Sequence, residues 1–294
     1  MNIDELKGHF RKLGTDLQVT VHDRPFGTPP RWRRRRARVT APAETRYVLN
    51  VQENGRKSEQ FTLDLWPSKI DRLEFVTADL RPDMQHLLLM VKRFSNEDNI
   101  VSKDKFLCGH DERHWFIATI PEAHGVANVP DAMEVLKPRT VIQSQRRNKV
   151  RAKDWHNRRN AGFIRQGEWF FLPMPNFQPH DVGLVLHNEP LRRPFGKAHI
   201  VEEIFRIGGE TVYVCHKFRA GLSEAQYNKV IQQNPKASKW NWRIMRRNPQ
   251  VYARGKVRHP DHKTIVLPFW HRVAMANERG TTAGGRPATV AFLD

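Results

Sequence analysis

The chain has 294 residues, of which 39% are apolar and 10% aromatic, a composition that supports one or two folded domains. The longest aliphatic run, Leu87–Val91, is far shorter than the roughly 20 residues of a membrane-spanning helix. The first ten residues, MNIDELKGHF, lack the apolar core of a secretory signal, and two cysteines cannot form a disulfide framework. We therefore expect a cytoplasmic protein in a reducing environment, with no membrane partner.

The formal net charge of +19 is concentrated in three segments. Residues 31–38 carry +6, residues 138–165 carry +8 and residues 236–272 carry +9, so the rest of the chain sums to about −4. Concentrated positive charge is typical of proteins that hold a polyanion, whereas charge that serves solubility is spread over the surface. These segments contain Trp, Asn and Gln rather than the apolar stripe of a membrane-surface helix. The pattern predicts DNA or RNA as the partner and leaves protein partners open.

The first half of the chain is predicted to consist mostly of strands. The expected elements are a helix over 3–13, a strand over 16–22, a β-hairpin over 45–66, strands over 73–80, 85–93 and 114–120, and a helix over 129–136. Asn54-Gly55 favours a tight turn in the hairpin. The strand over 85–93 does not alternate between apolar and polar residues, which indicates burial on both faces. The charged stretch 95–105 is expected to separate it from the last strand.

The second half mixes hairpins with one clear helix. The expected elements are a basic helix within 139–160, a hairpin over 162–175, a strand over 211–218, a helix over 223–234, and a hairpin formed by 250–258 and 263–269. Gln166-Gly167 and Pro260-Asp261 mark the two hairpin turns. Ser223 and Gln226 have the spacing of a capping box, which predicts where the helix begins.

This order of elements predicts an α+β fold, mostly antiparallel strands and hairpins with a few helices, in two halves. An N-terminal α+β region spans 1–137 and includes an exposed arm rich in Arg and Pro at 23–44. A basic linker or surface helix spans 138–161 and joins it to a C-terminal α+β domain over 162–276. A flexible tail spans 277–294, because these residues are small and polar.

All three basic segments are predicted to contact nucleic acid, because Arg and Lys neutralise phosphates and indole rings stack on unpaired bases. The candidate residues are Arg33, Arg34, Arg35, Arg36, Arg146, Arg147, Lys149, Arg151, Arg158, Arg159, Lys239, Trp240, Trp242, Arg243, Arg246, Arg247, Arg254, Lys256 and Arg258. The alternative is that the charges are simply solvated and that Trp240 and Trp242 belong to a core.

Two clusters of titratable residues suggest metal or catalytic chemistry. In CGHDERH (108–114), Cys108, His110 and His114 are possible metal ligands, although their spacing matches no standard zinc pattern. In VRHPDHKTIVLPFWH (257–271), His259, Asp261, His262 and His271 are candidate catalytic residues. For each cluster the alternative is an ordinary polar turn.

The second cluster, followed by Asn277, is similar to the set used by ββα-metal nucleases. That similarity covers roughly twenty residues and lacks a further His after Asn277, so the family is not assigned. His199, Glu202 and Glu203 would share one face if they lay on a helix, which is a further arrangement compatible with metal binding.

The sequence thus predicts a nucleic-acid-binding protein without a cofactor. One alternative is a metal-dependent nuclease or other hydrolase acting on nucleic acid, with a divalent metal at the His/Asp turn. A second is a structural component of a ribonucleoprotein or mobile-element complex. Whether the protein is an enzyme stays open, because the chain lacks the phosphate-binding and nucleophile motifs of the common nucleotide-dependent enzymes and hydrolases.

Overall fold

The protein has the expected α+β fold, with mostly antiparallel strands in several sheets. The computed structural model describes residues 3–23, 46–53, 58–67, 71–95, 98–121, 125–192 and 197–277. These residues form two compact units that divide between Lys137 and Pro138, and Asn277 belongs with the first. The predicted arm over 23–44 and tail over 277–294 therefore lie outside the described residues, apart from Asp23 and Asn277. None of the described helices is long and apolar enough to cross a lipid bilayer.

The described residues of the first unit form two sheets and two α-helices, α1 (Ile3–Leu13) and α2 (Val129–Leu136). The smaller sheet has the order β1 (Leu17–Val21), β3 (Glu59–Trp66), β2 (Arg46–Glu53), with β1 parallel to β3. The larger is an antiparallel meander of β4 (Asp71–Arg81), β5 (His86–Ser95), β6 (Ile100–Asp111) and β7 (His114–Ile120). A 3₁₀ turn, η2 (Pro82–Met84), connects β4 to β5.

The first half of strand β5 is buried on both faces, which explains why its sequence does not alternate. Leu87 and Leu89 pack into a core with Phe10 of α1. Leu88, which points to the opposite face, packs into a second core with Val129 of α2. The helices thus cover opposite faces of the meander, and the predicted helix boundaries at 3–13 and 129–136 are confirmed.

The charged stretch 95–105 is not the connection that its composition indicated. Strand β6 begins at Ile100 and pairs along its length with β5. Its polar side chains are tolerated because the first residues of the strand are largely exposed. Asp104 also accepts a hydrogen bond of 2.7 Å from the Tyr47 hydroxyl, which pairs one of the carboxylates. The prediction of a connection over 95–105, which was based on charge, is therefore wrong from Ile100 onward.

The second unit is built around a seven-stranded antiparallel sheet. Its order is β11 (Leu186–Leu191), β12 (His199–Ile207), β15 (Gln250–Arg258), β16 (Ile265–Met275), β10 (Trp169–Pro173), β9 (Phe163–Gln166) and β8 (Arg159–Asn160). Helix α3 (Arg139–Arg147) precedes the sheet, and two 3₁₀ turns, η3 (Ala152–Asp154) and η4 (Val182–Leu184), lie in its connections. Both predicted hairpins, 162–175 and 250–269, are present.

The sheet curls back on itself. Gln166 ends β9, which is separated from β15 by β10 and β16, yet its side-chain amide donates to the Val257 carbonyl of β15. Trp169 and Phe171 of β10 share one core with Val201 of β12 and Val257 of β15. Strands that are distant in sheet order therefore enclose a common interior.

Helix α3 is part of the second unit rather than a bare linker. Val141 is fully buried against Phe163 and Phe170, and Gln145 is buried as well. The basic side chains of Arg146 and Arg147 lie at the exposed C-terminal end of the helix, where positive charge complements the helix dipole. The segment 138–161 therefore combines a packed side with a charged, solvent-facing side.

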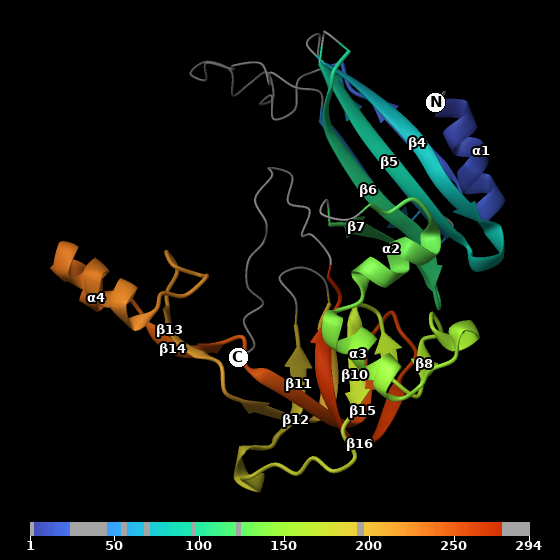
Figure 1. Ribbon diagram of the computed structural model, residues 1–294. Coiled ribbons are helices and arrows are strands. Elements are labelled where there is room, and N and C mark those ends of the chain that lie inside the picture. The colour runs from blue at the N-terminus through green and yellow to red at the C-terminus, as the bar shows by residue number, and fades with distance from the viewer. Residues whose placement is uncertain are drawn as a thin grey trace. The chain divides into compact units, whose positions relative to one another are not determined.

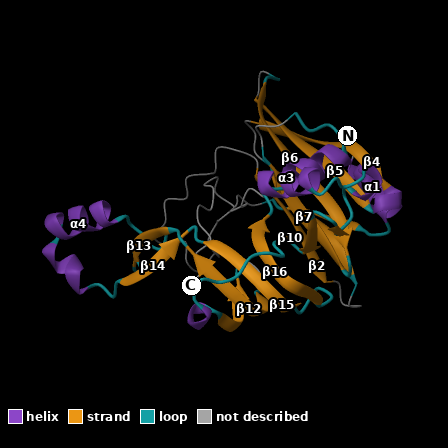
Figure 2. Ribbon diagram, turned by 60° about the horizontal axis from the view of Figure 1, so that its bottom comes forward, coloured by secondary structure: helices purple, strands orange, loops and turns teal. Residues whose placement is uncertain are grey.

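Residues 210–249 form a separate lobe of the second unit, seen in Figure 1 and Figure 2 to extend away from the large sheet. The lobe contains the hairpin of β13 (Glu210–Val214) and β14 (Arg243–Arg247), helix α4 (Glu224–Gln233) and the 3₁₀ turn η5 (Pro235–Lys239). Helix α4 begins with the capping box predicted at Ser223 and Gln226. Gly208 and Gly209, both at positive φ, allow the chain to turn from β12 into the lobe.

Candidate functional site

Three histidines from two distant parts of the sequence converge in the second unit. His199 begins β12, and His259 and His262 lie in the turn between β15 and β16. Because Ile200 pairs with Arg258 in the antiparallel ladder, His199 and His259 lie one step beyond that pair on neighbouring strands. We call His199, His259 and His262 the histidine triad.

The triad has the geometry of a metal-ligand set. One ring nitrogen from each residue lies within 4.8 Å of the other two, and within the described ranges no other group of His, Cys, Asp or Glu meets this criterion. The ring centroids of His199 and His259 are 4.2 Å apart, and those of His259 and His262 are 4.7 Å apart. His199 is 1% exposed, whereas the other two are partly exposed, so the group opens toward solvent.

The turn between β9 and β10 packs against the triad. Gly167 has φ 56°, and a Cβ here would lie 2.8 Å from His262 Nε2 and 3.4 Å from His199 Nε2. Only glycine therefore fits without displacing a histidine. Gln166 is fully buried and donates from Nε2 to the Lys263 carbonyl at 2.7 Å and to the Val257 carbonyl at 3.3 Å. One side chain thus holds both ends of the turn that carries His259 and His262.

Backbone and charged groups orient His259. Its Nε2 lies 3.3 Å from the Lys197 carbonyl, and since a carbonyl only accepts, this bond places the proton on Nε2. Nδ1 then carries the lone pair, which accepts the Asp261 amide at 3.1 Å. The Asp261 carboxylate pairs with Lys197 at 2.6 Å, so it is held outside the triad.

Of the four candidate catalytic residues in 257–271, the structure brings two into the triad. His259 and His262 belong to it, whereas Asp261 is paired with Lys197. His271 is buried on β16 and bonds the Phe269 carbonyl at 2.7 Å. Burial lowers the pKa of His271 below its ordinary value of 6.5, and the nearby Arg159 acts in the same direction.

The structure does not assemble the candidate ligands in 108–114. Cys108 is fully buried in the core of the first unit, where burial raises the pKa of its thiol. His110 packs against the ring of Trp115, and His114 bonds the Glu59 carboxylate at 2.6 Å. Since each residue is engaged separately, the turn is a polar hairpin connection between β6 and β7.

The predicted nucleic-acid contacts are distributed over several surfaces. Arg33, Arg34, Arg35 and Arg36 lie outside the described residues. Arg146, Arg147, Lys149, Arg151 and Arg159 are exposed, and Arg151 pairs with Asp154. Burial, and secondly the guanidinium of Arg165, lower the pKa of Arg158 to about 10.

The third basic segment is divided between the sheet and the lobe. On β15, Arg254 is bound by Glu203 and lies over the Trp270 ring, and Arg258 donates to the Asn188 side chain. Lys256 is exposed on the same strand. Lys239 is exposed in the lobe, and Arg247 pairs with Glu210. The charge of this segment is therefore partly neutralised within the unit.

Trp240 and Trp242 lie side by side in an aromatic cluster of the lobe. The Trp242 ring stacks on Phe218 with the centroids 5.9 Å apart, and the two indoles are 6.1 Å apart. Lys217 places its ammonium 3.9 Å from the centre of the Trp240 ring. These contacts give both tryptophans a role in holding the lobe together, since α4 contributes no fully buried side chain.

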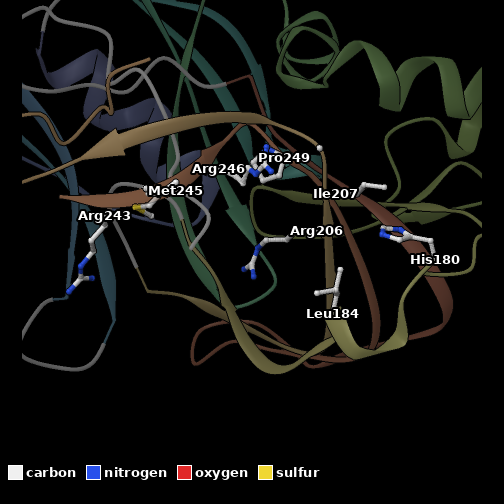
Figure 3. A pocket seen from close by; sticks show the side chains of 10 residues that line it. His180, Leu184, Arg206, Ile207, Arg243, Met245, Arg246 and Pro249 are labelled. Carbon is white, nitrogen blue, oxygen red and sulfur yellow. The ribbon is translucent and has the colours of Figure 1, made fainter. Parts of the chain in front are cut away.

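A groove of about 780 Å³ lies where the lobe joins the sheet. Its lining residues are His180, Leu184, Arg206, Ile207, Gly208, Arg243, Ile244, Met245, Arg246 and Pro249. Figure 3 shows His180, Leu184 and Ile207 on one side, Arg243 and Met245 on the other, and Arg206 between them. The groove thus combines three guanidinium groups with apolar side chains.

Several apolar residues of the groove are exposed to solvent. Ile244 is 70% exposed and Leu184 is 52% exposed, and the neighbouring Val182 is 78% exposed. The Arg246 guanidinium donates one hydrogen bond, 3.5 Å long, to the Gly209 carbonyl. Within the described residues, neither Arg243 nor Arg246 forms an ion pair. A mixed apolar and cationic surface of this kind is typical of a binding site.

Reasoning from the sequence did not identify Arg206, treated Gln166-Gly167 only as a hairpin turn, and considered His199 only on a helix. His199 lies on β12, where alternation turns Glu202 to the opposite face, and Glu203 is paired with Arg254, so neither carboxylate joins His199. No local spacing links His199 to a turn about sixty residues later. Comparison with protein-family models, curated proteins and solved structures found no match.

Proposed function

We propose that the protein binds single-stranded nucleic acid in the groove between the lobe and the large sheet. The observation that carries this proposal is the composition of the groove, in which Arg206, Arg243 and Arg246 line the same surface as Ile207 and Met245. Guanidinium groups pair with phosphates, and apolar side chains accommodate the faces of unpaired bases.

The apolar part of the groove favours a single strand over a duplex. In a duplex the base faces are stacked inside, so a protein surface meets mainly phosphate and sugar. Ile244 and Leu184, each more than half exposed, would then gain little. An unpaired strand presents its bases to such side chains while its phosphates lie near Arg243 and Arg246.

The basic surface on α3 offers a second, purely ionic contact. Arg146 and Arg147 are exposed at the end of the helix, with Lys149 just beyond. These residues would attract any polyanion, but none of the large apolar side chains that are strongly exposed among the described residues lies within 138–161. These basic residues therefore make a suitable reference for the contribution of charge alone.

The test is the binding of a fluorescent oligodeoxythymidylate and of the matching duplex, measured by anisotropy over a range of salt concentrations. The double variant Arg243→Ala/Arg246→Ala is compared with Arg146→Ala/Arg147→Ala, which removes the same charge. We expect the groove variant to reduce the slope of log affinity against log salt by about 1.4, or roughly 0.7 for each phosphate contact on a single strand.

Two results would overturn nucleic-acid binding in the groove, and a third would overturn its preference for a single strand. One is an equal loss of affinity in the two double variants, which would reduce the interaction to net charge. The other is the absence of binding to any oligonucleotide at low salt by the folded wild-type protein. A preference for duplex over single strand would contradict the role of Ile244 and Leu184.

A further inference from the structure

The histidine triad lies apart from the groove, although both involve strand β12. His199 begins this strand and Ile207 ends it. Eight residue steps at roughly 3.3 Å each place them about 26 Å apart along the strand. A ligand of the triad is therefore not the phosphate that the groove would hold, and the triad needs an explanation of its own.

The donor set indicates the class of ligand. All three members of the triad are imidazoles, and Asp261, the carboxylate next to His262, is engaged by Lys197. Nitrogen donors suit zinc and its neighbours in the first transition series, whereas magnesium and calcium prefer oxygen. The ring nitrogens lie within 4.8 Å of one another. Ligands about 2.0–2.1 Å from one tetrahedral zinc ion are roughly 3.4 Å apart, so small rotations of the imidazole side chains would complete the site.

The residues around the triad resemble the support that metal-binding histidines receive. A ligating histidine usually donates its other ring N–H to a carbonyl or carboxylate, and His259 Nε2 does so to Lys197. That bond leaves His259 Nδ1 as the ligand atom, and an ion would replace the Asp261 amide that now lies 3.1 Å away. Gln166 fixes the two ends of the turn, and Gly167 leaves the space in which His262 approaches His199.

We propose that His199, His259 and His262 bind one zinc-type divalent ion, with one coordination position left open toward solvent. Three protein ligands and a fourth, exchangeable position are typical of zinc sites that bind a water or a small anion. The partial exposure of His259 and His262 provides the approach for that fourth ligand. The ion also joins β12 to the β15–β16 turn, so it stabilises the second unit.

The experiment uses the full chain, stripped of metal with a chelator and titrated with Co²⁺ and Zn²⁺. Visible absorption of Co²⁺ reports the coordination, and calorimetry gives affinity and stoichiometry. We expect one ion per chain and a rise in the melting temperature on binding. The variants His259→Ala and His262→Ala should lose more than about 100-fold in affinity, which exceeds the effect of losing a residue that only orients a ligand.

The controls separate ligation from folding and from nucleic-acid binding. His187→Ala removes an exposed histidine of β11 and should leave metal affinity unchanged. Arg243→Ala/Arg246→Ala should also bind metal normally, so failure of the nucleic-acid proposal would not affect this result. Circular dichroism of the metal-free variants shows whether each has folded.

Three outcomes would overturn the proposal in whole or in part. Failure of the folded wild-type protein to bind Co²⁺ or Zn²⁺ stoichiometrically rejects the site. Full affinity in a folded His259→Ala or His262→Ala variant rejects the ligand set. A Co²⁺ spectrum that does not change on addition of azide or free imidazole rejects the open coordination position.

Discussion

Gln166 donates a hydrogen bond of 2.7 Å to the carbonyl of Lys263, which lies almost a hundred residues later in the chain. The same amide group also reaches the Val257 carbonyl, on the other side of the turn that bears His259 and His262. This pairing joins the end of β9 to the β15–β16 turn across the curled sheet. It therefore couples the stability of the sheet to the position of two triad members.

Replacement of Gln166 by Leu removes both hydrogen bonds and leaves the Val257 and Lys263 carbonyls, of which the first is buried, without this donor. We expect the free energy of unfolding to fall by about 1–3 kcal/mol and Zn²⁺ affinity to fall by about 10- to 100-fold. Urea unfolding and metal titration measure the two effects. Gln145→Leu is the matched control, because Gln145 is also fully buried and donates to a carbonyl, that of Trp155. The control should lose stability but keep its metal affinity; an equal loss of affinity in both would contradict the coupling.

Gly167→Ala should weaken metal binding by the triad in addition to straining the backbone. The new Cβ would lie 2.8 Å from His262 Nε2, so the histidine must move. Gly208→Ala is the control, since Gly208 also has positive φ but no atom lies within 4 Å of the added Cβ. Both variants should lose about 1–2 kcal/mol from the left-handed backbone conformation, but only Gly167→Ala should also bind Co²⁺ more weakly. Equal metal affinities in the two variants would show that the contact with His262 is unimportant.

Glu203 contributes to stability in a way that depends on acid pH. The hydrogen bond from Arg254 lowers the pKa of Glu203 below its ordinary 4.5, so the unfolded chain binds this proton at a higher pH than the folded chain does. The stabilisation is therefore present above pH 4.5 and is lost as the pH falls through the lower, folded-state pKa. Melting temperatures between neutral and acid pH should decline less steeply in Glu203→Gln than in the wild type.

Glu202→Gln provides the comparison for that measurement. Glu202 is exposed, lies next to Glu203 on β12 and accepts the backbone amide of Lys256, a bond that glutamine can also make. The melting temperature of Glu202→Gln should change with pH as that of the wild type does. A Glu203→Gln profile as steep as the wild-type profile would show that the ion pair with Arg254 does not contribute to acid sensitivity.

His271 should affect the stability of the folded protein at a higher pH than Glu203 does. Burial lowers its pKa below 6.5, so the unfolded state takes up this proton first as the pH falls. The folded state therefore loses stability from pH 6.5 down to the folded-state pKa of His271, and the loss is complete below that pKa. His271→Gln should flatten this part of the stability profile, measured in the presence of a chelator so that metal binding does not contribute. His187→Gln, which changes an exposed histidine, should not flatten it.

Most of the local structure followed from the sequence because it depends on neighbouring residues. Apolar periodicity identified α1 and α2, alternation identified the hairpin of β2 and β3, and capping-box spacing located the start of α4. For residues 95–105, charge indicated a connection although β6 begins at Ile100, and no strand was predicted for β11, β12 or β14. Pairing with β5 outweighs charge in β6, since Lys103 is exposed and the partly buried Asp104 and Lys105 have hydrogen-bond partners in Tyr47 and Val126.

The sequence by itself determined the α+β class, several of the helices and hairpins and the concentration of positive charge, because each is set by composition or by spacing along the chain. Only the tertiary structure brought His199 to His259 and His262, and placed Gln166 and Gly167 beside them. It also gathered Arg206, Arg243 and Arg246 around one groove. These sets join residues that are far apart in the chain, and their proximity depends on strand register and on the curl of the sheet, which no local pattern encodes.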